Sequence, residues 1–157
     1  MVGCRLWIMG VGCALALAAP VGGAAAESEQ QLLATLDKPA VVTVEPGPVR
    51  GPGQSPRVEI IVTGFQPPLN EKEAVQAVVK AKQEGSETEP VIGRFSIFPN
   101  TQFKAADPSK GRRFGNFPLP KELAGGGPVK LTVQLVPFEN RGPGTGATLQ
   151  LGGAEIR

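Results

Sequence analysis

Few side chains in this sequence are of the types that carry redox, metal or nucleophilic chemistry. Among 157 residues there is no histidine and no tyrosine, and every cysteine, methionine and tryptophan lies within the first 13 positions. Copper and zinc sites need imidazole, thiolate or thioether ligands, and most general-base schemes near neutral pH need histidine or cysteine. Residues 27–157 are therefore predicted to hold no metal or other cofactor and no catalytic triad.

Carboxylates are the main remaining candidates for catalysis. Glycoside hydrolysis needs two acids that meet in space, and the sequence offers Glu59, Glu71, Glu73 and Glu139. No spacing singles out a pair. A calcium loop at Asp107 would have one acid where the ion takes six to eight oxygens, and no Lys-Ser/Thr pair follows the glycine-rich turns to make a phosphate cradle. We expect a protein that is not an enzyme.

Three residues are candidate contacts with a partner. Most of the seven phenylalanines are expected in the core, but Phe103 follows Pro99 in a predicted loop, where an aromatic ring can fill a partner's pocket. Arg112 and Arg113 could pair with a partner's acids. The alternative, which we favour, is that this pair marks a solvated strand edge, where charge discourages pairing between sheets.

The first 26 residues have the form of a secretory signal peptide. Arg5 precedes an apolar run over 6–19, and three alanines end at Ala26, before Glu27. An uncleaved membrane anchor is the alternative, because no charge interrupts 6–26, and a lipid-modified Cys13 is a third. Cleavage predicts an exported protein, periplasmic or extracellular, that is not held in a membrane and has no cysteine left for a disulfide.

Without the signal the chain has 15 basic residues (16 less Arg5) against 14 acids, a net charge of +1. So small a net charge favours neither nucleic acid nor an anionic membrane as a partner. The remaining length suits one domain with one hydrophobic core. We expect a polar leader over 27–35, a folded domain over 36–157 and a Pro/Gly-rich loop over 45–56.

Alternating apolar residues predict an all-β domain. In 129–136 the odd-numbered residues are Val or Leu and most of the others are polar, the period-2 pattern of a half-buried strand. Further strands are expected at 40–44, 57–65, 91–98, 112–117, 147–151 and 154–156. Gly152 and Gly153 predict a bulge between the last two, 101–111 a loop, and 120–123 a helical turn.

One segment fits two patterns. Residues 71–82 (EKEAVQAVVKAK) are rich in helix formers, yet Val75, Ala77, Val79 and Ala81 alternate as in a strand. Propensity alone favours a helix, and we adopt a strand because of the family resemblance described next. Short strands separated by Gly/Pro turns predict an antiparallel β-sandwich or barrel.

Six segments together resemble the C-terminal domain of polyphenol oxidases and tyrosinases. They are 36–44 (LDKPAVVTV), 58–64 (VEIIVTG), 75–80 (VQAVVK), 91–98 (VIGRFSIF), 131–137 (LTVQLVP) and 149–156 (LQLGGAEI). The resemblance covers nearly all of the chain after the signal. It departs from the plant pattern at 75–78, where plant members carry Lys-Phe-Asp-Val.

The resemblance implies a fold and a role. In that family the domain is a β-sandwich that packs over the copper site of a preceding helical domain, which supplies six copper-binding histidines. This sequence contains no histidine and therefore none of those ligands. The resemblance therefore implies an accessory domain that docks on, or shields, a separate tyrosinase-like copper protein. The alternative is a free-standing module that binds a ligand or another protein, since a fold alone does not fix a function.

Overall fold

A computed structural model describes residues 32–45, 55–83, 85–124 and 127–157. The predicted signal peptide, most of the leader and most of the 45–56 loop lie outside these residues. The described chain forms β1 (Leu33–Thr35), β2 (Ala40–Val44), β3 (Arg57–Gln66), β4 (Val75–Gln83), β5 (Val91–Phe95), β6 (Phe103–Lys104), β7 (Arg112–Pro118), β8 (Val129–Pro137) and β9 (Thr148–Ile156). Two short 3-10 turns, η1 (Pro108–Lys110) and η2 (Lys121–Leu123), complete it.

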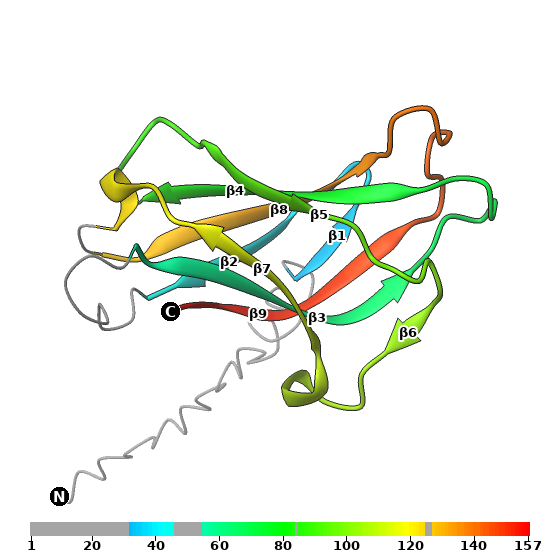
Figure 1. The fold of residues 1–157 in the computed structure, drawn as a ribbon, viewed down its shortest axis with the longest axis horizontal. Coiled ribbons are helices and arrows are strands. Elements are labelled where there is room, and N and C mark those ends of the chain that lie inside the picture. The colour runs from blue at the N-terminus through cyan, green and yellow to red at the C-terminus, as the bar shows by residue number, and fades with distance from the viewer. Residues whose placement is uncertain (1–31, 46–54, 84, 125–126) are drawn as a thin grey trace, which may run out of the picture.

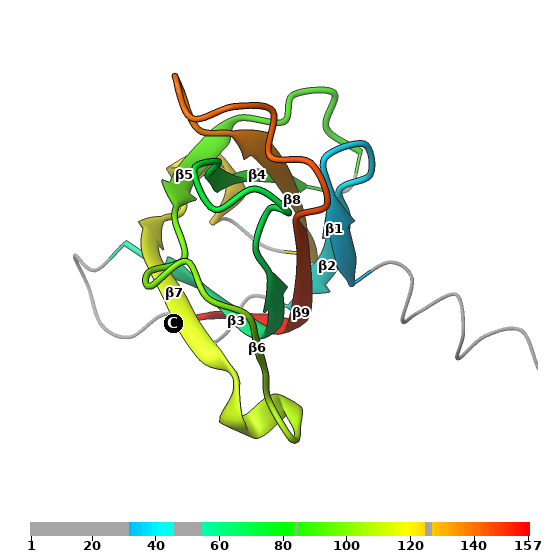
Figure 2. The ribbon, with the colours of Figure 1, turned by 90° about the vertical axis from the view of Figure 1, so that its right-hand side faces the viewer.

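The strands form two antiparallel sheets packed against each other, so the predicted β-sandwich is confirmed (Figure 1). The first sheet has the order β1-β9-β3-β6, with β7 also paired to β3, and the second has the order β2-β8-β4-β5. The β1–β2 turn carries the chain from one sheet to the other. Viewed from the end, the sheets curve around one core (Figure 2). No helix in the described ranges is long and apolar enough to cross a membrane.

The core follows the predicted alternation. On β3 the side chains of Val58, Ile60 and Val62 are fully buried. On β8 the odd-numbered residues 129–135 are buried, and the even-numbered ones point outward. Burial of these aliphatic side chains is the main stabilising term, at about 1.5–3 kcal/mol for each large one.

The segment predicted at 71–82 contains a strand, as adopted, despite its helix propensity, but the strand is β4, Val75–Gln83, and residues 71–74 lie in the loop before it. β4 lies in the middle of its sheet, paired with β8 along its whole length and with β5 on the other side. Val75, Ala77, Val79 and Ala81 face the core. A helix would place these four residues around its circumference, so tertiary burial overrides local preference.

Three further predictions about element bounds are corrected by the structure. The last three residues of the predicted leader form β1, which pairs with β9. The predicted loop 101–111 contains β6, which pairs with β3, and η1. The strand expected at 91–98 ends at Phe95. The bulge at Gly152 is confirmed, because Ile61 pairs with Gly153 and Val62 with Leu151, but β9 continues through it as one strand.

Aromatic side chains close one side of the sandwich, where β5 lies against β7. The ring of Phe95 stacks on that of Phe114 at 4.9 Å between centroids, and on that of Phe117 at 6.3 Å. Gly93 lets the ring of Phe117 lie directly over the backbone, since a Cβ there would be 2.0 Å from a ring carbon. These three rings pack against the core, as predicted for most of the phenylalanines.

Candidate docking surface

Two of the three predicted contact residues lie together. Phe103 on β6 packs half-buried against the core, and the guanidinium of Arg112 on β7 covers its ring, with Cζ 4.0 Å from the centroid. Such a cation–π contact is favourable by about 0.5–1 kcal/mol at an exposed site. Phe103 is therefore capped by its own chain and does not project as a free aromatic plug.

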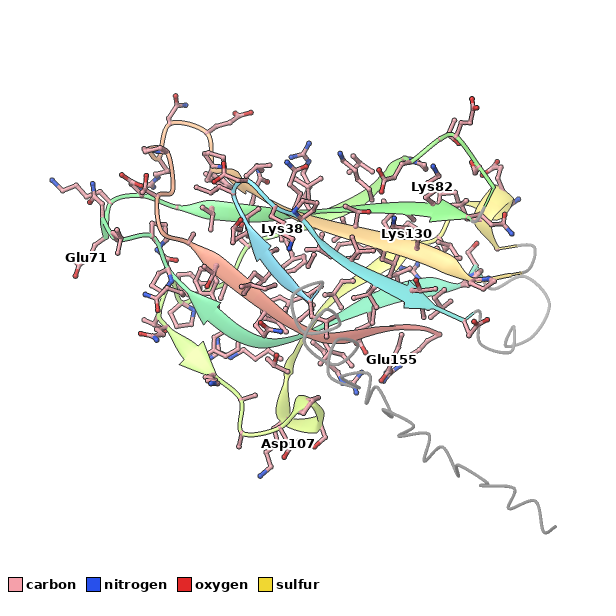
Figure 3. The ribbon with its side chains drawn as sticks, turned by 180° about the vertical axis from the view of Figure 1, so that it is seen from behind. Lys38, Glu71, Lys82, Asp107, Lys130 and Glu155 are labelled. Carbon is pink, nitrogen blue, oxygen red and sulfur yellow. The ribbon has the colours of Figure 1, made fainter. Side chains whose placement is uncertain are left out.

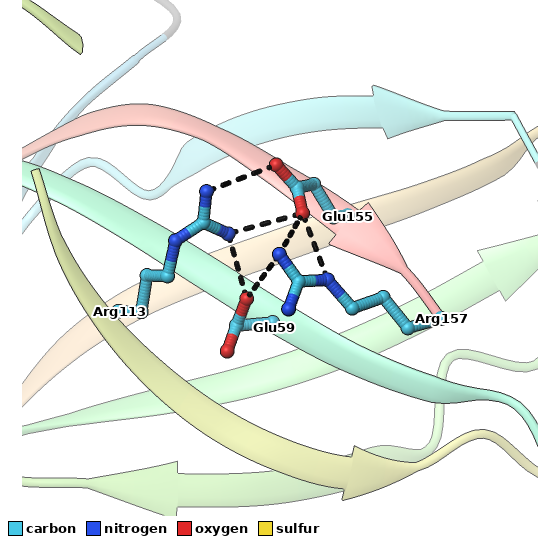
Figure 4. A network of polar contacts seen from close by, with 4 residues as sticks. All are labelled: Glu59, Arg113, Glu155 and Arg157. Carbon is cyan, nitrogen blue, oxygen red and sulfur yellow. Dashed lines mark hydrogen bonds and ion pairs between the residues drawn. The ribbon is translucent and has the colours of Figure 1, made fainter. Parts of the chain in front are cut away.

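Arg113, the third, belongs to a network of two acids and two arginines (Figure 4). Its Nη1 donates to Glu59 at 2.7 Å and to Glu155 at 3.0 Å. Arg157 bonds Glu155 at 2.7 Å and lies 3.3 Å from Glu59. The two acids stand directly opposite each other on β3 and β9. In the described chain, β7 pairs with β3 alone. Arg112 and Arg113, which begin β7, therefore lie at a sheet edge.

The electrostatics of this network do not suit acid–base catalysis. Hydrogen bonds from Arg113 and then Arg157 lower the pKa of Glu155, and Glu155, followed by Glu59, raises the pKa of Arg113. A glycosidase needs one carboxyl held neutral by a raised pKa beside one that is ionised. Here the two guanidiniums favour the ionised form of Glu155, and the contacts with Glu59 and Glu155 fit a structural cross-link between three strands.

The other acids considered from the sequence do not join Glu59. The carboxylate of Glu73 accepts hydrogen bonds from the backbone N–H groups of Gly144 at 2.8 Å and Thr145 at 3.0 Å. Glu71 and Glu139 are exposed. Asp107 caps η1, and its pKa is lowered by the hydrogen bond from the Ser109 hydroxyl. No group of three or more His, Cys, Asp or Glu side chains in the described residues is placed to hold a metal ion.

Exposed apolar side chains lie instead in three loops that share one end of the sandwich, the right-hand end of the ribbon in Figure 1. Phe98 is 89% exposed, Leu69 78% and Phe138 44%. They lie in the β5–β6, β3–β4 and β8–β9 loops, respectively. We call these three residues the apolar tip. Glu71, in the same β3–β4 loop, marks this end in Figure 3.

Hydrogen bonds tie the three loops together. Leu69 N donates to Thr145 O at 2.9 Å, and Phe138 N donates to Ala74 O at 2.8 Å. The Glu73 carboxylate also links the β3–β4 loop to the β8–β9 loop, because it accepts a hydrogen bond from Gly144 N. In the β5–β6 loop, the side-chain amide of Asn100 donates to Glu73 O at 3.4 Å. The apolar tip therefore stands on loops that are held in place before any partner arrives.

Sequence reasoning missed the apolar tip. The sequence predicts Phe98 as the end of a strand, and the side chain is exposed because the chain leaves β5 at Phe95. Leu69 follows Pro67 and Pro68, and neither proline can donate to a sheet. The sequence signal for an exposed loop residue was an apolar residue next to a proline and outside any alternating pattern. This signal does not indicate which loops come together in the fold.

A second surface feature is a groove on the outer face of the first sheet. Two adjoining hollows of about 280 and 720 Å³ lie between β1 and the β6–η1 segment. Both are bordered by Leu33, Thr63, Lys104 and Gln150. The lining combines an apolar edge with amide, hydroxyl and ammonium groups, which could hydrogen-bond a polar ligand.

Comparison of this chain with protein-family models, with curated proteins and with solved structures finds no match in any of the three.

Proposed function

We propose that this protein is a non-enzymatic binding module that docks on another protein through the apolar tip. The observation that supports the proposal is the gathering of Leu69, Phe98 and Phe138, all well exposed, on three loops at one end of the sandwich. Grouped exposed apolar side chains favour protein contact, whereas single ones scattered over a surface are ordinary.

The energetics agree with docking. Full burial of a phenylalanine or leucine side chain contributes about 1.5–3 kcal/mol, and aromatic residues are frequent hot spots of interfaces. Because Glu73 already accepts hydrogen bonds from the Gly144 N–H group and from the side-chain amide of Asn100, which hold the loops in place, little ordering entropy would be lost on binding.

For the partner we propose a tyrosinase-like di-copper protein, with the sandwich covering its copper site. This part rests on the sequence segments that resemble the polyphenol oxidase C-terminal domain, and the comparisons add nothing to it. The apolar tip gives the proposal a physical form, since a projecting Phe98 could enter a hydrophobic substrate channel of the partner.

The test measures diphenol oxidation by a tyrosinase-like enzyme of the same host in the presence of this protein. We expect saturable inhibition by the wild type, and a loss of at least about tenfold in apparent affinity for Phe98→Ser, the factor that 1.4 kcal/mol represents. Val91→Ser is the matched control, because Val91 is also exposed, at 49%, but lies at the opposite end of β5. Equal inhibition by both variants would reject the apolar tip, and no inhibition by the wild type would reject the copper partner.

The groove on the first sheet supports a second candidate, the binding of a neutral polar ligand such as an oligosaccharide. Thr63 and Gln150 offer a hydroxyl and an amide to sugar hydroxyls, and Leu33 offers an apolar surface to a ring face. Amide chemical shifts recorded during titration with a panel of oligosaccharides would test it. Shifts confined to Thr63, Lys104 and Gln150 would favour the groove over the apolar tip.

A further inference from the structure

The edge strands of the two sheets differ in how well they are protected from pairing with another chain. β7 carries Arg112 and Arg113 and is bent at Gly115 and Asn116, whose φ angles are +118° and +93°. β5 carries Arg94 and has a register shift at Val79/Lys80 in its pairing with β4. β1 and β6 are only three and two residues long. Charges, bulges and shortness are the usual devices that blunt a sheet edge.

β2 has none of these devices. It is five residues long, Ala-Val-Val-Thr-Val, with no charge, glycine or proline, and it pairs with β8 in an unbroken register from Ala40 to Val44. In the described chain, these residues make no backbone hydrogen bonds beyond the ladder with β8. Among the described residues, the side of β2 away from β8 has no hydrogen-bonded strand, and its nearest element is β9 of the first sheet, which packs against β2 without pairing with it. Its N–H and C=O groups on that side can therefore pair with another strand.

We propose that two copies of this protein pair through β2, antiparallel, about a twofold axis at Val42. The four-stranded sheet of one copy would then continue into that of the other. This register is self-complementary: the buried, inward-facing Ala40 lies opposite Val44 of the second copy, and the outward-facing Val41 lies opposite Thr43. Residues directly opposite each other lie on the same face of a sheet. In this register the core-facing side chains of both copies therefore lie on one face of the joined sheet, and the outward-facing ones lie on the other.

Charges at the two ends of β2 fit the same arrangement. Lys38 precedes the strand and Glu45 follows it, and both are exposed. An antiparallel pair brings the Lys38 end of one copy beside the Glu45 end of the other, twice in each dimer, whereas a parallel pair would place like charges together. Figure 3 shows Lys38 at the turn where β1 meets β2, with β2 facing the viewer. Five residues a side is a small interface, so the dimer is weak and depends on concentration.

The inference is independent of the proposed function. β2 carries no residue of the apolar tip, and the substitutions below leave Leu69, Phe98 and Phe138 unchanged.

Sedimentation velocity of the purified protein over a range of concentrations tests the pairing with two matched variants. V41K/T43E places a lysine at position 41 opposite a glutamate at position 43 of the second copy, twice, whereas V41E/T43E places two acids together, twice. Both variants carry the same glutamate opposite Lys130 of β8, so they differ only at position 41. We expect wild type and V41K/T43E to dimerise, and V41E/T43E to associate at least about tenfold more weakly. Mixing V41E/T43E with V41K/T43K is expected to restore the dimer.

A cross-link tests the register without a change in charge. In a background with Cys4 and Cys13 replaced by serine, Val42→Cys places a thiol against its own copy on the twofold axis, so mild oxidation is expected to give a covalent dimer. Thr43→Cys lies opposite residue 41 and is too far from its own copy to form a disulfide. A wild type that stays monomeric, equal association of the two charge variants, or equal cross-linking at 42 and 43 would each overturn the proposal.

Discussion

Within the network of Glu59, Arg113, Glu155 and Arg157, the stability contributed by the Glu155 carboxyl group depends on pH. The pKa of Glu155 is below its ordinary value because Arg113 and then Arg157 donate hydrogen bonds to the carboxylate. A carboxyl whose folded-state pKa is lowered contributes stability that is complete above its unfolded pKa and is lost as the pH falls through the folded one.

Glu155→Gln is therefore expected to lower the melting temperature at pH 7 by a small amount and to leave it nearly unchanged once the pH has fallen below the folded-state pKa of Glu155, where the native carboxyl is also neutral. Thermal unfolding followed by circular dichroism between pH 2.5 and 7 measures the difference. Glu122→Gln, in the exposed turn η2, is the control. A loss that persists at the lowest pH would contradict the electrostatic explanation and point to packing.

At Gly93, one missing side chain permits an aromatic contact. A Cβ there would lie 2.0 Å from the ring of Phe117, although the backbone itself would accept alanine. Gly93→Ala is therefore expected to cost about 1–3 kcal/mol by overpacking. In a Phe117→Ala background the same change is expected to cost little, because the clashing ring is absent. Urea unfolding of the four proteins of this double-mutant cycle gives the coupling, and additive losses would contradict the proposed contact.

At the scale of elements, the link between the β3–β4 and β8–β9 loops depends on Glu73, whose carboxylate accepts hydrogen bonds from two backbone N–H groups of the β8–β9 loop. Hydrogen bonds to a charged group are worth about 1.5–3 kcal/mol, so Glu73→Ala is expected to destabilise the protein by an amount near this range. It should also speed amide hydrogen exchange at Gly144 and Thr145. The exposed neighbour Glu71→Ala should change stability by less than about 0.5 kcal/mol. Unchanged exchange at both amides would show that the loop is held by other contacts.

Elements with long alternating patterns could be predicted from the sequence, and the two shortest strands could not. β3 and β8 were predicted because burial of one face requires period-2 alternation. β1 and β6 were missed since two or three residues contain no period, and each forms only because a longer strand offers it hydrogen bonds. The candidate site divides in the same way. Phe103 and Arg112 were singled out from their local context, while the apolar tip depends on loops that converge only in the fold.

At the scale of the whole molecule, stability must come from the core, because no cysteine lies beyond Cys13 to make a disulfide within the described domain. Neighbouring residues of β3 offer a matched comparison. Ile60 is fully buried between the sheets, whereas Ile61 is half-buried on the outer face, against the backbone at Gly111 and Gly152.

Ile60→Ala is expected to destabilise the protein by about 2–5 kcal/mol, since it removes buried methyl groups and leaves a cavity. Ile61→Ala should cost clearly less, because its side chain already contacts water. Urea unfolding monitored by circular dichroism compares the midpoints, and an unchanged slope shows that both variants still unfold in one step. Equal losses at the two positions would mean that the outer face is covered to the same extent as the core, by chain or by a partner, and that the sandwich is only part of the stable unit.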